Sequence, residues 1–244
     1  MTRRVRPLRA VTLDYWDTLY DGSNLAERLR LRRAAVGRLL AAYGVALDDA
    51  ALDDLYRASG RESERWWREE HRGYTTIERL HWMLRRAGAE PRDECAHVAE
   101  AVRVVDEALT AYPPPLLPGA AELVRRLAAR LPLAIVSDTG FASGRGQDAL
   151  LARDGLLECF TATVYSCDVG HAKPRPEPFH AALAALGVDA ADTLHVGDIE
   201  RTDVRGALGV GMRAVRLDIV RPGGETAAEY VAASYGELIE YLEP

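Results

Sequence analysis

Residues 11–20 read VTLDYWDTLY, in which a short apolar run ends at Asp14. Four later segments have the same form, and they read LAIVSD (133–138), ATVYS (162–166), TLHVGD (193–198) and RAVRLD (213–218). Short, mostly β-branched runs of this kind are typical of strands that are covered on both faces of a sheet. Stretches with helical periodicity separate the later runs, at residues 147–153, 177–186 and 203–208. Strands that alternate with helices predict an α/β fold with a Rossmann-like, doubly wound parallel sheet.

The interval between residues 21 and 112 has a different pattern, with amphipathic helical segments and no convincing strand. Asn24 is a suitable cap for a helix that runs to Tyr43. Thr75 is placed to open a second helix, and Pro91 suits the first turn of a third.

The segment PPPLLPG (113–119) then leads back to the sheet-forming region, as a stiff linker does. We therefore predict an α/β core at residues 1–20 and 113–244, interrupted by an all-helical insert at residues 21–112.

The composition excludes several classes of protein. A chain of 244 residues with 48% hydrophobic content can bury a core, and a formal charge of −6 argues against a nucleic-acid or anionic-membrane partner. No apolar stretch of roughly 7–15 residues follows the N-terminal MTRRVRPLRA, and no window approaches the roughly 20 apolar residues that span a bilayer. The three cysteines have no CxxC spacing and suit a reducing compartment. These features predict a cytoplasmic protein with neither a membrane nor a nucleic acid as its partner.

Candidate functional residues lie at or just beyond the carboxyl ends of different predicted strands, and they are Asp14, Ser137, Lys173 and Asp198. In open parallel sheets, ligands bind outside these ends, where the strand order reverses. Lysine occurs only at Lys173, among 31 lysine and arginine residues. Its ammonium group is a compact charge on a flexible stem, which suits close contact with a carboxylate or a phosphate.

These residues resemble the four ordered motifs of the haloacid dehalogenase-like (HAD) hydrolases. The motif segments are VTLDYWDTLY with Asp14, LAIVSDTG with Ser137, GHAKPRPEPF with Lys173, and HVGDIERTDVRGA with Asp198 and Asp203. The helical insert resembles the first-type cap of that family. The resemblance implies a phosphatase for small-molecule phosphate esters, in which Asp14 attacks phosphorus and forms an aspartyl-phosphate. It further implies that Ser137 donates a hydrogen bond to the transferring phosphoryl group and that Lys173 offsets the charge.

The same resemblance implies a Mg²⁺ cofactor. Its protein ligands would be the Asp14 carboxylate, the backbone carbonyl of Trp16 and Asp198, with Asp203 as a further ligand or as a residue supporting the others. Carboxylates, carbonyl oxygens and water are the ligands that this hard cation prefers.

The sequence departs from the family pattern at Trp16, where most phosphatases of the family carry a second aspartate. That aspartate protonates the leaving oxygen and then activates water, and losing such a group costs ~10²–10⁴ in rate for poor leaving groups. Asp17 is displaced by one residue, which reverses the side-chain direction in an extended segment. It could still replace the missing acid, although a carboxylate that caps a turn amide is the favoured interpretation.

Three functions are compatible with this departure. The first is a phosphatase for good leaving groups or for substrates that supply their own acid, with help from His171 or a residue of the insert. The second is a dehalogenase, because L-2-haloacid dehalogenases also carry an aromatic residue two places after the nucleophile. The pair Gly197 and Asp198 favours phosphate over halide, since those dehalogenases lack it. The third is a non-catalytic relative that binds a phosphorylated ligand. A Schiff-base mechanism in the insert is excluded, because residues 1–172 contain no lysine.

The insert is rich in arginine, at positions 28, 30, 32, 33, 57, 61, 65 and 68. One interpretation is a cationic lid over a substrate with a second anionic group. The favoured interpretation is a solvated face paired with Glu62, Glu64, Glu69 and Glu70. The tryptophans Trp66, Trp67 and Trp82 are interpreted as packing residues, of which one or two line the entrance of the pocket. Trp16 is expected to narrow that pocket.

Overall fold

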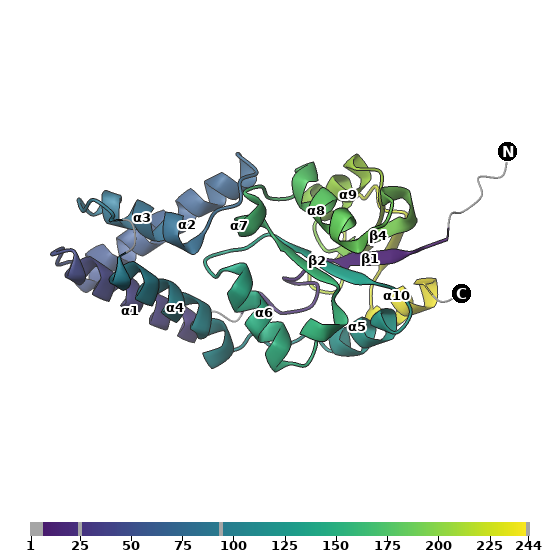
Figure 1. Ribbon diagram of the computed structural model, residues 1–244, viewed down its shortest axis with the longest axis horizontal. Coiled ribbons are helices and arrows are strands. Elements are labelled where there is room, and N and C mark those ends of the chain that lie inside the picture. The colour runs from purple at the N-terminus through teal and green to yellow at the C-terminus, as the bar shows by residue number, and fades with distance from the viewer. Residues whose placement is uncertain (1–6, 24–25, 93–94, 243–244) are drawn as a thin grey trace.

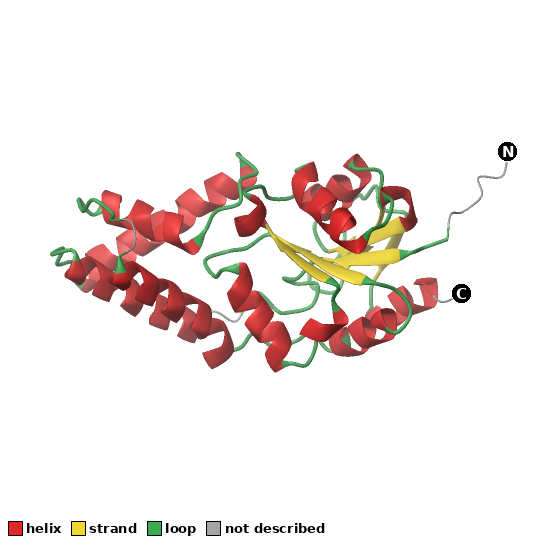
Figure 2. Ribbon diagram, viewed as in Figure 1, coloured by secondary structure: helices red, strands yellow, loops and turns green. Residues whose placement is uncertain are grey.

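The computed structural model describes residues 7–23, 26–92 and 95–242 and contains a six-stranded parallel sheet (Figures 1 and 2). The strand order is β3-β2-β1-β4-β5-β6. The strands are β1 (Ala10–Leu13), β2 (Leu133–Ser137), β3 (Ala162–Tyr165), β4 (Thr193–Gly197), β5 (Arg213–Leu217) and β6 (Tyr230–Ala232). The predicted α/β fold is confirmed. Each of the five predicted strands ends one residue earlier than its quoted run, so the polar residue follows the strand.

The strand β1 lies in the middle of the sheet, and the strand order reverses beside it. Leu13 is in register with Ile135 of β2 on one side and with Val196 of β4 on the other. The backbone N–H of Asp14 donates to the carbonyl of Val196 at 2.9 Å, which carries the β1–β4 pairing one residue further. Asp14 is therefore fixed at the switch point of the sheet, where open α/β proteins bind their ligands.

Helices cover both faces of the sheet, as Figure 2 shows. Alternate residues of β2 separate the two layers, because successive side chains of a strand point to opposite faces. Leu133 and Ile135 pack against α5 (Ala120–Ala128), α6 (Gly144–Arg153) and α10 (Tyr235–Leu242). Ala134 and Val136 pack against α8 (Pro176–Leu186) and α9 (Arg205–Gly209). The sheet is therefore doubly wound, as predicted.

Short helical turns occupy the connections between these elements. They are η1 (Leu157–Cys159), α7 (Ser166–Val169), η2 (Ala190–Asp192) and the π-helical turn η3 (Glu200–Val204). The helix predicted at residues 203–208 thus begins earlier, as η3, and continues as α9. This π-turn brings Asp203 back under the end of β4.

Four helices, α1 (Ala26–Ala42), α2 (Asp49–Arg68), α3 (Thr76–Arg86) and α4 (Ala96–Ala111), lie between β1 and the rest of the sheet-forming chain. Figure 1 shows them together, away from the sheet. They share a core of their own that includes Val36, Leu80 and Val105. None of the helices in the described part of the chain combines the length and the apolar character needed to cross a bilayer.

The helix boundaries of this insert were predicted with mixed success. Thr75 caps α3 as predicted, in a capping box with Glu78. The prediction that Pro91 opens a helix is wrong, because α4 begins at Ala96. Residues 91–94 read PRDE, so a helix that began at Pro91 would add a first turn with no large apolar residue to bury. The predicted cap Asn24 lies outside the described residues.

Candidate active site

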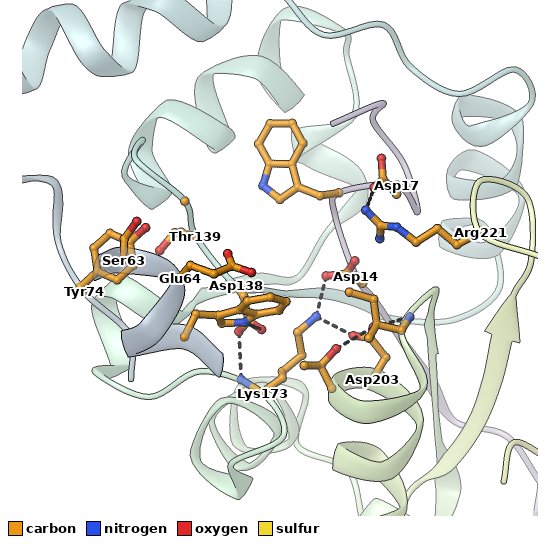
Figure 3. Close-up of a pocket in the computed structure, with 15 residues that line it drawn as sticks. Asp14, Asp17, Ser63, Glu64, Tyr74, Asp138, Thr139, Lys173, Asp203 and Arg221 are labelled. Atoms are coloured by element: carbon orange, nitrogen blue, oxygen red, sulfur yellow. Dashed lines mark hydrogen bonds and ion pairs between the residues drawn. The ribbon is translucent and has the colours of Figure 1, made fainter. Parts of the chain in front are cut away.

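The ammonium group of Lys173 lies between two carboxylates, as Figure 3 shows. Its Nζ is 2.5 Å from Oδ1 of Asp14 and 2.6 Å from Oδ1 of Asp203. All three side chains are buried, with exposed fractions of 2%, 6% and 1%, respectively. The backbone N–H of Lys173 donates to Oδ1 of Asp138 at 2.9 Å, which ties the lysine loop to the end of β2. The lone lysine of the sequence therefore meets the predicted nucleophile directly.

Asp203 is held in place by several contacts. Its Oδ2 accepts the N–H of Ile199 at 2.9 Å, and its Oδ1 lies 3.3 Å from Nε2 of the buried His195. The other ring nitrogen of His195 lies 2.8 Å from Oγ1 of Thr12 on β1. A Cβ atom at Gly197 would lie 2.4 Å from Cγ of Asp203, so a side chain at that position would displace the carboxylate. Glycine at the end of β4 thus makes room for Asp203.

Three carboxylates meet at this point. One oxygen of each of Asp14, Asp198 and Asp203 lies within 4.8 Å of the others. Oδ1 of Asp198 is buried and has no hydrogen-bond partner among the described residues. No backbone N–H in the described part of the chain donates to the carbonyl of Trp16. A buried carboxylate oxygen without a donor and a carbonyl without a donor fit a hard divalent cation, whose ligands are oxygens.

The pKa values of these groups reflect their crowding. Burial raises the pKa of Asp14 well above its usual value, against the attraction of Lys173, and the charges of Asp203 and Asp198 raise it further. Burial and the charge of Asp203 raise the pKa of Asp198 to about 6, although Arg221 opposes this shift. Burial alone would raise the pKa of Asp203, but Lys173 and His195 lower it below its usual value. The carboxylates repel one another, and a cation at this position would relieve that repulsion.

Arg221 reaches the site from the loop after β5 (Figure 3), and no sequence pattern distinguishes it from the many other arginines. Its guanidinium forms ion pairs with Asp198 and with Asp17. Asp17 has a φ of 57°, and its Oδ1 accepts the N–H of Gly22 at 2.9 Å. Both carboxylate oxygens of Asp17 are therefore engaged, which agrees with the favoured interpretation of a turn carboxylate.

A first cavity of about 260 Å³ opens over Asp14, Lys173 and Asp203. The helix α2 contributes Trp67, and Nε1 of Trp67 donates to Oδ2 of Asp138 at 2.9 Å. This hydrogen bond joins the insert to the segment that follows β2. Trp66 and Trp82 instead pack within the helical insert, whereas Ser63, Glu64, Tyr74 and Trp16 also line the cavity. The cavity is therefore built jointly by the sheet and the insert.

Ser137 does not line this cavity. It is buried at the end of β2, and its Oγ donates to Oε1 of Gln147 at 3.1 Å. Thr139, two residues further on, lines the cavity instead, and its Oγ1 lies 3.1 Å from Oγ of Ser166. His171 is 3.8 Å from Glu177 and is not among the described residues that line the cavity. A role for His171 as the missing acid finds no support in this arrangement.

Three arginines of α2 differ from two arginines of α1 in their exposure. On α2, Arg57 pairs with Asp54, Arg65 with Glu62 and Glu70, and Arg68 with Glu64, and these arginines are exposed. These pairs form the solvated face that the sequence predicts. Arg28 and Arg32 on α1 are buried, and for them that prediction is wrong. They line a second cavity beside the first.

Comparisons with known proteins identify a relative of this chain and structures with the same fold. A relative from Methanopyrus kandleri, a glyceraldehyde 3-phosphate phosphatase, is 31% identical over 210 residues, which cover 86% of this chain and 84% of the relative. The crystal structure of a HAD phosphatase from Thermococcus onnurineus superposes with a TM-score of 0.67 at 22% identity, over 97% of this chain and 98% of that chain. A 2-haloacid dehalogenase from Pseudomonas syringae superposes with a TM-score of 0.66 at 23% identity, over 96% and 98% of the two chains. Both structural matches concern the fold.

A family model settles the assignment. The model for haloacid dehalogenase-like hydrolases matches residues 8–211, which include every residue that the sequence analysis placed in the site. The chain belongs to the haloacid dehalogenase-like hydrolase family.

Proposed function

We propose that the protein is a Mg²⁺-dependent phosphatase that hydrolyses a small-molecule phosphate ester through an aspartyl-phosphate on Asp14. The observation that carries this proposal is the position of Asp14, which contacts Lys173 at the edge of a cavity and has two further carboxylates beside it. The phosphatase activity of the relative from Methanopyrus kandleri supports the same reaction class.

In this proposal, a carboxylate oxygen of Asp14 attacks phosphorus. An O–P bond forms while the ester P–O bond breaks, and the leaving oxygen departs with the electron pair and takes a proton from solvent or from an acid group of the substrate. Water then attacks the phosphorus of the aspartyl-phosphate, which releases phosphate and restores Asp14. Lys173 orients Asp14 and offsets negative charge as the phosphoryl group arrives. Ser137 would assist once its hydroxyl rotates from Gln147 toward the phosphoryl oxygens.

The proposed metal ligands are the carboxylates of Asp14, Asp198 and Asp203 and the carbonyl of Trp16. When bound, Mg²⁺ supplies charge neutralisation and orientation for the phosphoryl group. Arg221 holds one oxygen of Asp198, which directs the other toward the three-carboxylate site. His195 and Ile199 hold Asp203 in the same way.

We further propose that residues 21–112 act as a cap on a core made of residues 1–20 and 113–244. The hydrogen bond between Trp67 and Asp138 is a contact that closing and opening would make and break. Closure of such a lid excludes water and lets its residues select the substrate.

Trp16 limits the reaction to certain leaving groups. It lines the cavity, but its indole N–H is too weak an acid to protonate a leaving oxygen, and Asp17 is engaged by Gly22 and Arg221. Substrates with good leaving groups, or with an acid of their own, would therefore be hydrolysed fastest. The same aromatic residue is the observation that favours a second candidate function, displacement of halide from a 2-haloacid by Asp14.

The test is phosphate release from p-nitrophenyl phosphate and acetyl phosphate, measured with Mg²⁺ and with EDTA. We expect metal-dependent release that Asp14→Asn abolishes. Asp54→Asn, on the exposed face of α2, is the matched control and should keep the activity of the native chain. Absence of phosphate release from both substrates under every metal condition would refute the proposal. Halide release from 2-haloacids would then test the second candidate.

A further inference from the structure

The second cavity has a volume of about 470 Å³ and lies beside the first. The two cavities share four lining residues, namely Trp16, Asp17, Gly140 and Arg221. A ligand whose phosphoryl group lies near Asp14 can therefore extend past Trp16 into the second cavity. Small-molecule sites in proteins have volumes of this order.

Two buried arginines of α1 line this second cavity. Arg28 and Arg32 are four residues apart and so lie on one face of the helix, with exposed fractions of 1% and 8%. Nε of Arg32 donates to the carbonyl of Val105 at 3.3 Å. Within the described part of the chain, no carboxylate forms an ion pair with Arg32.

A buried charge of this kind is costly. Transfer of a cation out of water is strongly unfavourable unless an opposite charge and hydrogen bonds compensate it. Burial, together with the charges of Arg28 and Arg79, lowers the pKa of Arg32 to about 10 against the opposing influence of Tyr56 and Asp106, so the guanidinium remains charged at neutral pH. An anion in the cavity would add direct compensation for this charge.

Gln147 adds an independent observation. It is fully buried, lines the second cavity, and accepts the hydroxyl of Ser137 through Oε1. Its Nε2 has no hydrogen-bond partner among the described residues. A buried donor without an acceptor is destabilising, so such a group in a native cavity indicates a place for an acceptor from a ligand.

The single acidic residue among the described lining residues is Asp17. It is already bonded to Gly22 and paired with Arg221. The cavity thus presents N–H donors from Arg32 and Gln147, and Arg28, whose charge Asp21 partly offsets, lies on the same wall. Its chemistry is that of a site for anionic oxygens.

We propose that the second cavity is a subsite for a second anionic group of the substrate. The substrate class is then a phosphate monoester whose leaving alcohol carries a carboxylate or another phosphate, with Arg28, Arg32 and Gln147 as the residues that recognise it. This inference rests on the proposed phosphatase function, because it assigns the far end of the same substrate.

The test compares esters matched in length. The set is 3-hydroxypropyl phosphate, the corresponding 3-carbon carboxylate ester (3-phosphonooxypropanoate) and propane-1,3-diyl bisphosphate, with 2-carbon and 4-carbon analogues of each. A charge-assisted hydrogen bond of roughly 1.5–3 kcal/mol corresponds to roughly 10- to 100-fold in kcat/KM. We therefore expect the kcat/KM of at least one ester with a second anionic group to exceed that of its hydroxyalkyl partner by that ratio. The carboxylate and bisphosphate arms identify which anion the subsite accepts.

The variants assign this preference to the subsite. Arg32→Met should bring the ratio of kcat/KM for the ester with a second anionic group to kcat/KM for the hydroxyalkyl ester close to one. Arg28→Met should also lower this ratio. Arg30→Met is the matched control, because Arg30 lies on the same helix, is exposed and pairs with Glu27, and it should keep the native ratio. Circular dichroism checks that each variant folds. If Arg32→Met does not fold, Arg32→Lys replaces it, and we expect it to lower the ratio because lysine keeps the charge but lacks the planar pair of donors.

A binding measurement separates this inference from the phosphatase proposal. The same esters are titrated calorimetrically into Asp14→Asn, with and without Arg32→Met. Preferential binding of the doubly anionic ester that Arg32→Met removes would support the subsite even if no phosphate were released. The subsite would be refuted if the native protein had a kcat/KM ratio near one and if Asp14→Asn bound the esters with and without a second anionic group equally. A preference that persists unchanged in both arginine variants would also refute it.

Discussion

Lys173 joins two carboxylates that come from distant parts of the chain, and its geometry explains why lysine occupies this position. Only 2% of it is exposed, and its Nζ contacts Asp14 and Asp203 at once. A guanidinium is wider and planar, so Lys173→Arg would keep the charge but could not fit between the two oxygens. We expect phosphate release to fall by ~10²-fold or more, the usual result of removing one donor from a preorganised site.

The measurement for Lys173→Arg is kcat with p-nitrophenyl phosphate. Arg175→Lys is the control, since Arg175 is exposed, lies two residues away and pairs with Glu177. Activity of Lys173→Arg within threefold of the native rate would mean that charge alone suffices at this position.

Trp16 is the position at which a general acid can be introduced into the site. Trp16→Asp would place a carboxyl group where the family usually carries its general acid, and general acids matter most for poor leaving groups. We expect the ratio of kcat/KM for an alkyl phosphate to that for p-nitrophenyl phosphate to rise by ~10-fold or more. Trp16→Asn has the same size but cannot transfer a proton, so it should leave the ratio low. An equal rise in both variants would point to relief of crowding rather than to acid catalysis.

At the scale of elements, the strands of the sheet could be predicted because each apolar run ends at a polar residue. The strand β6 could not, because Tyr230–Ala232 is too short to form a pattern. The burial of Arg28 and Arg32 was also missed, since α1 packs against α4 and this contact depends on the tertiary fold. Arg221 reaches the site from a loop, and neither spacing nor periodicity distinguishes it from other arginines.

An ion pair at the end of β5 makes the stability of the fold depend on pH. Nε–H of Arg216 donates to Oδ1 of Asp218 at 2.6 Å, and both side chains are more than nine-tenths buried. Burial alone would raise the pKa of Asp218, but the hydrogen bonds from Arg216 and from the N–H of Gly223 outweigh it, and the pKa is lowered. A carboxyl with a lowered folded pKa stabilises the protein above its unfolded pKa of about 3.9, and this stability is lost as the pH falls through the folded pKa.

We therefore expect Asp218→Asn to lower the free energy of unfolding by about 1–2 kcal/mol at pH 7. The difference in the free energy of unfolding between native protein and variant should become smaller as the pH falls below about 4. Urea unfolding followed by circular dichroism at pH 7, 5, 4 and 3 measures it. A difference that stays constant across this range would mean that the variant acts through packing and not through the charge.

At the scale of the whole molecule, the three-carboxylate site joins segments that are far apart in the sequence. Asp14 follows β1, Asp198 follows β4 and Asp203 lies in η3, so a cation held by all three would bind the folded chain and not the unfolded one. Binding at 100 times the dissociation constant adds about 2.7 kcal/mol to the free energy of unfolding. For a chain of this size, 1 kcal/mol corresponds to roughly 2–4 °C in Tm.

We thus expect Mg²⁺ to raise Tm by roughly 5–10 °C over EDTA, read by calorimetry without any substrate. Asp198→Asn should lose most of this rise, because it weakens the ligand whose Oδ1 has no other partner among the described residues. Asp54→Asn, exposed on α2, should keep the rise.

A native chain with the same Tm in Mg²⁺ and EDTA would argue against a metal at this site. A rise that survives in Asp198→Asn would place the binding elsewhere. Burial and the charge of Asp203 raise the pKa of Asp198 to about 6 although Arg221 and Lys173 oppose this shift, and a cation that relieves the repulsion would therefore raise Tm.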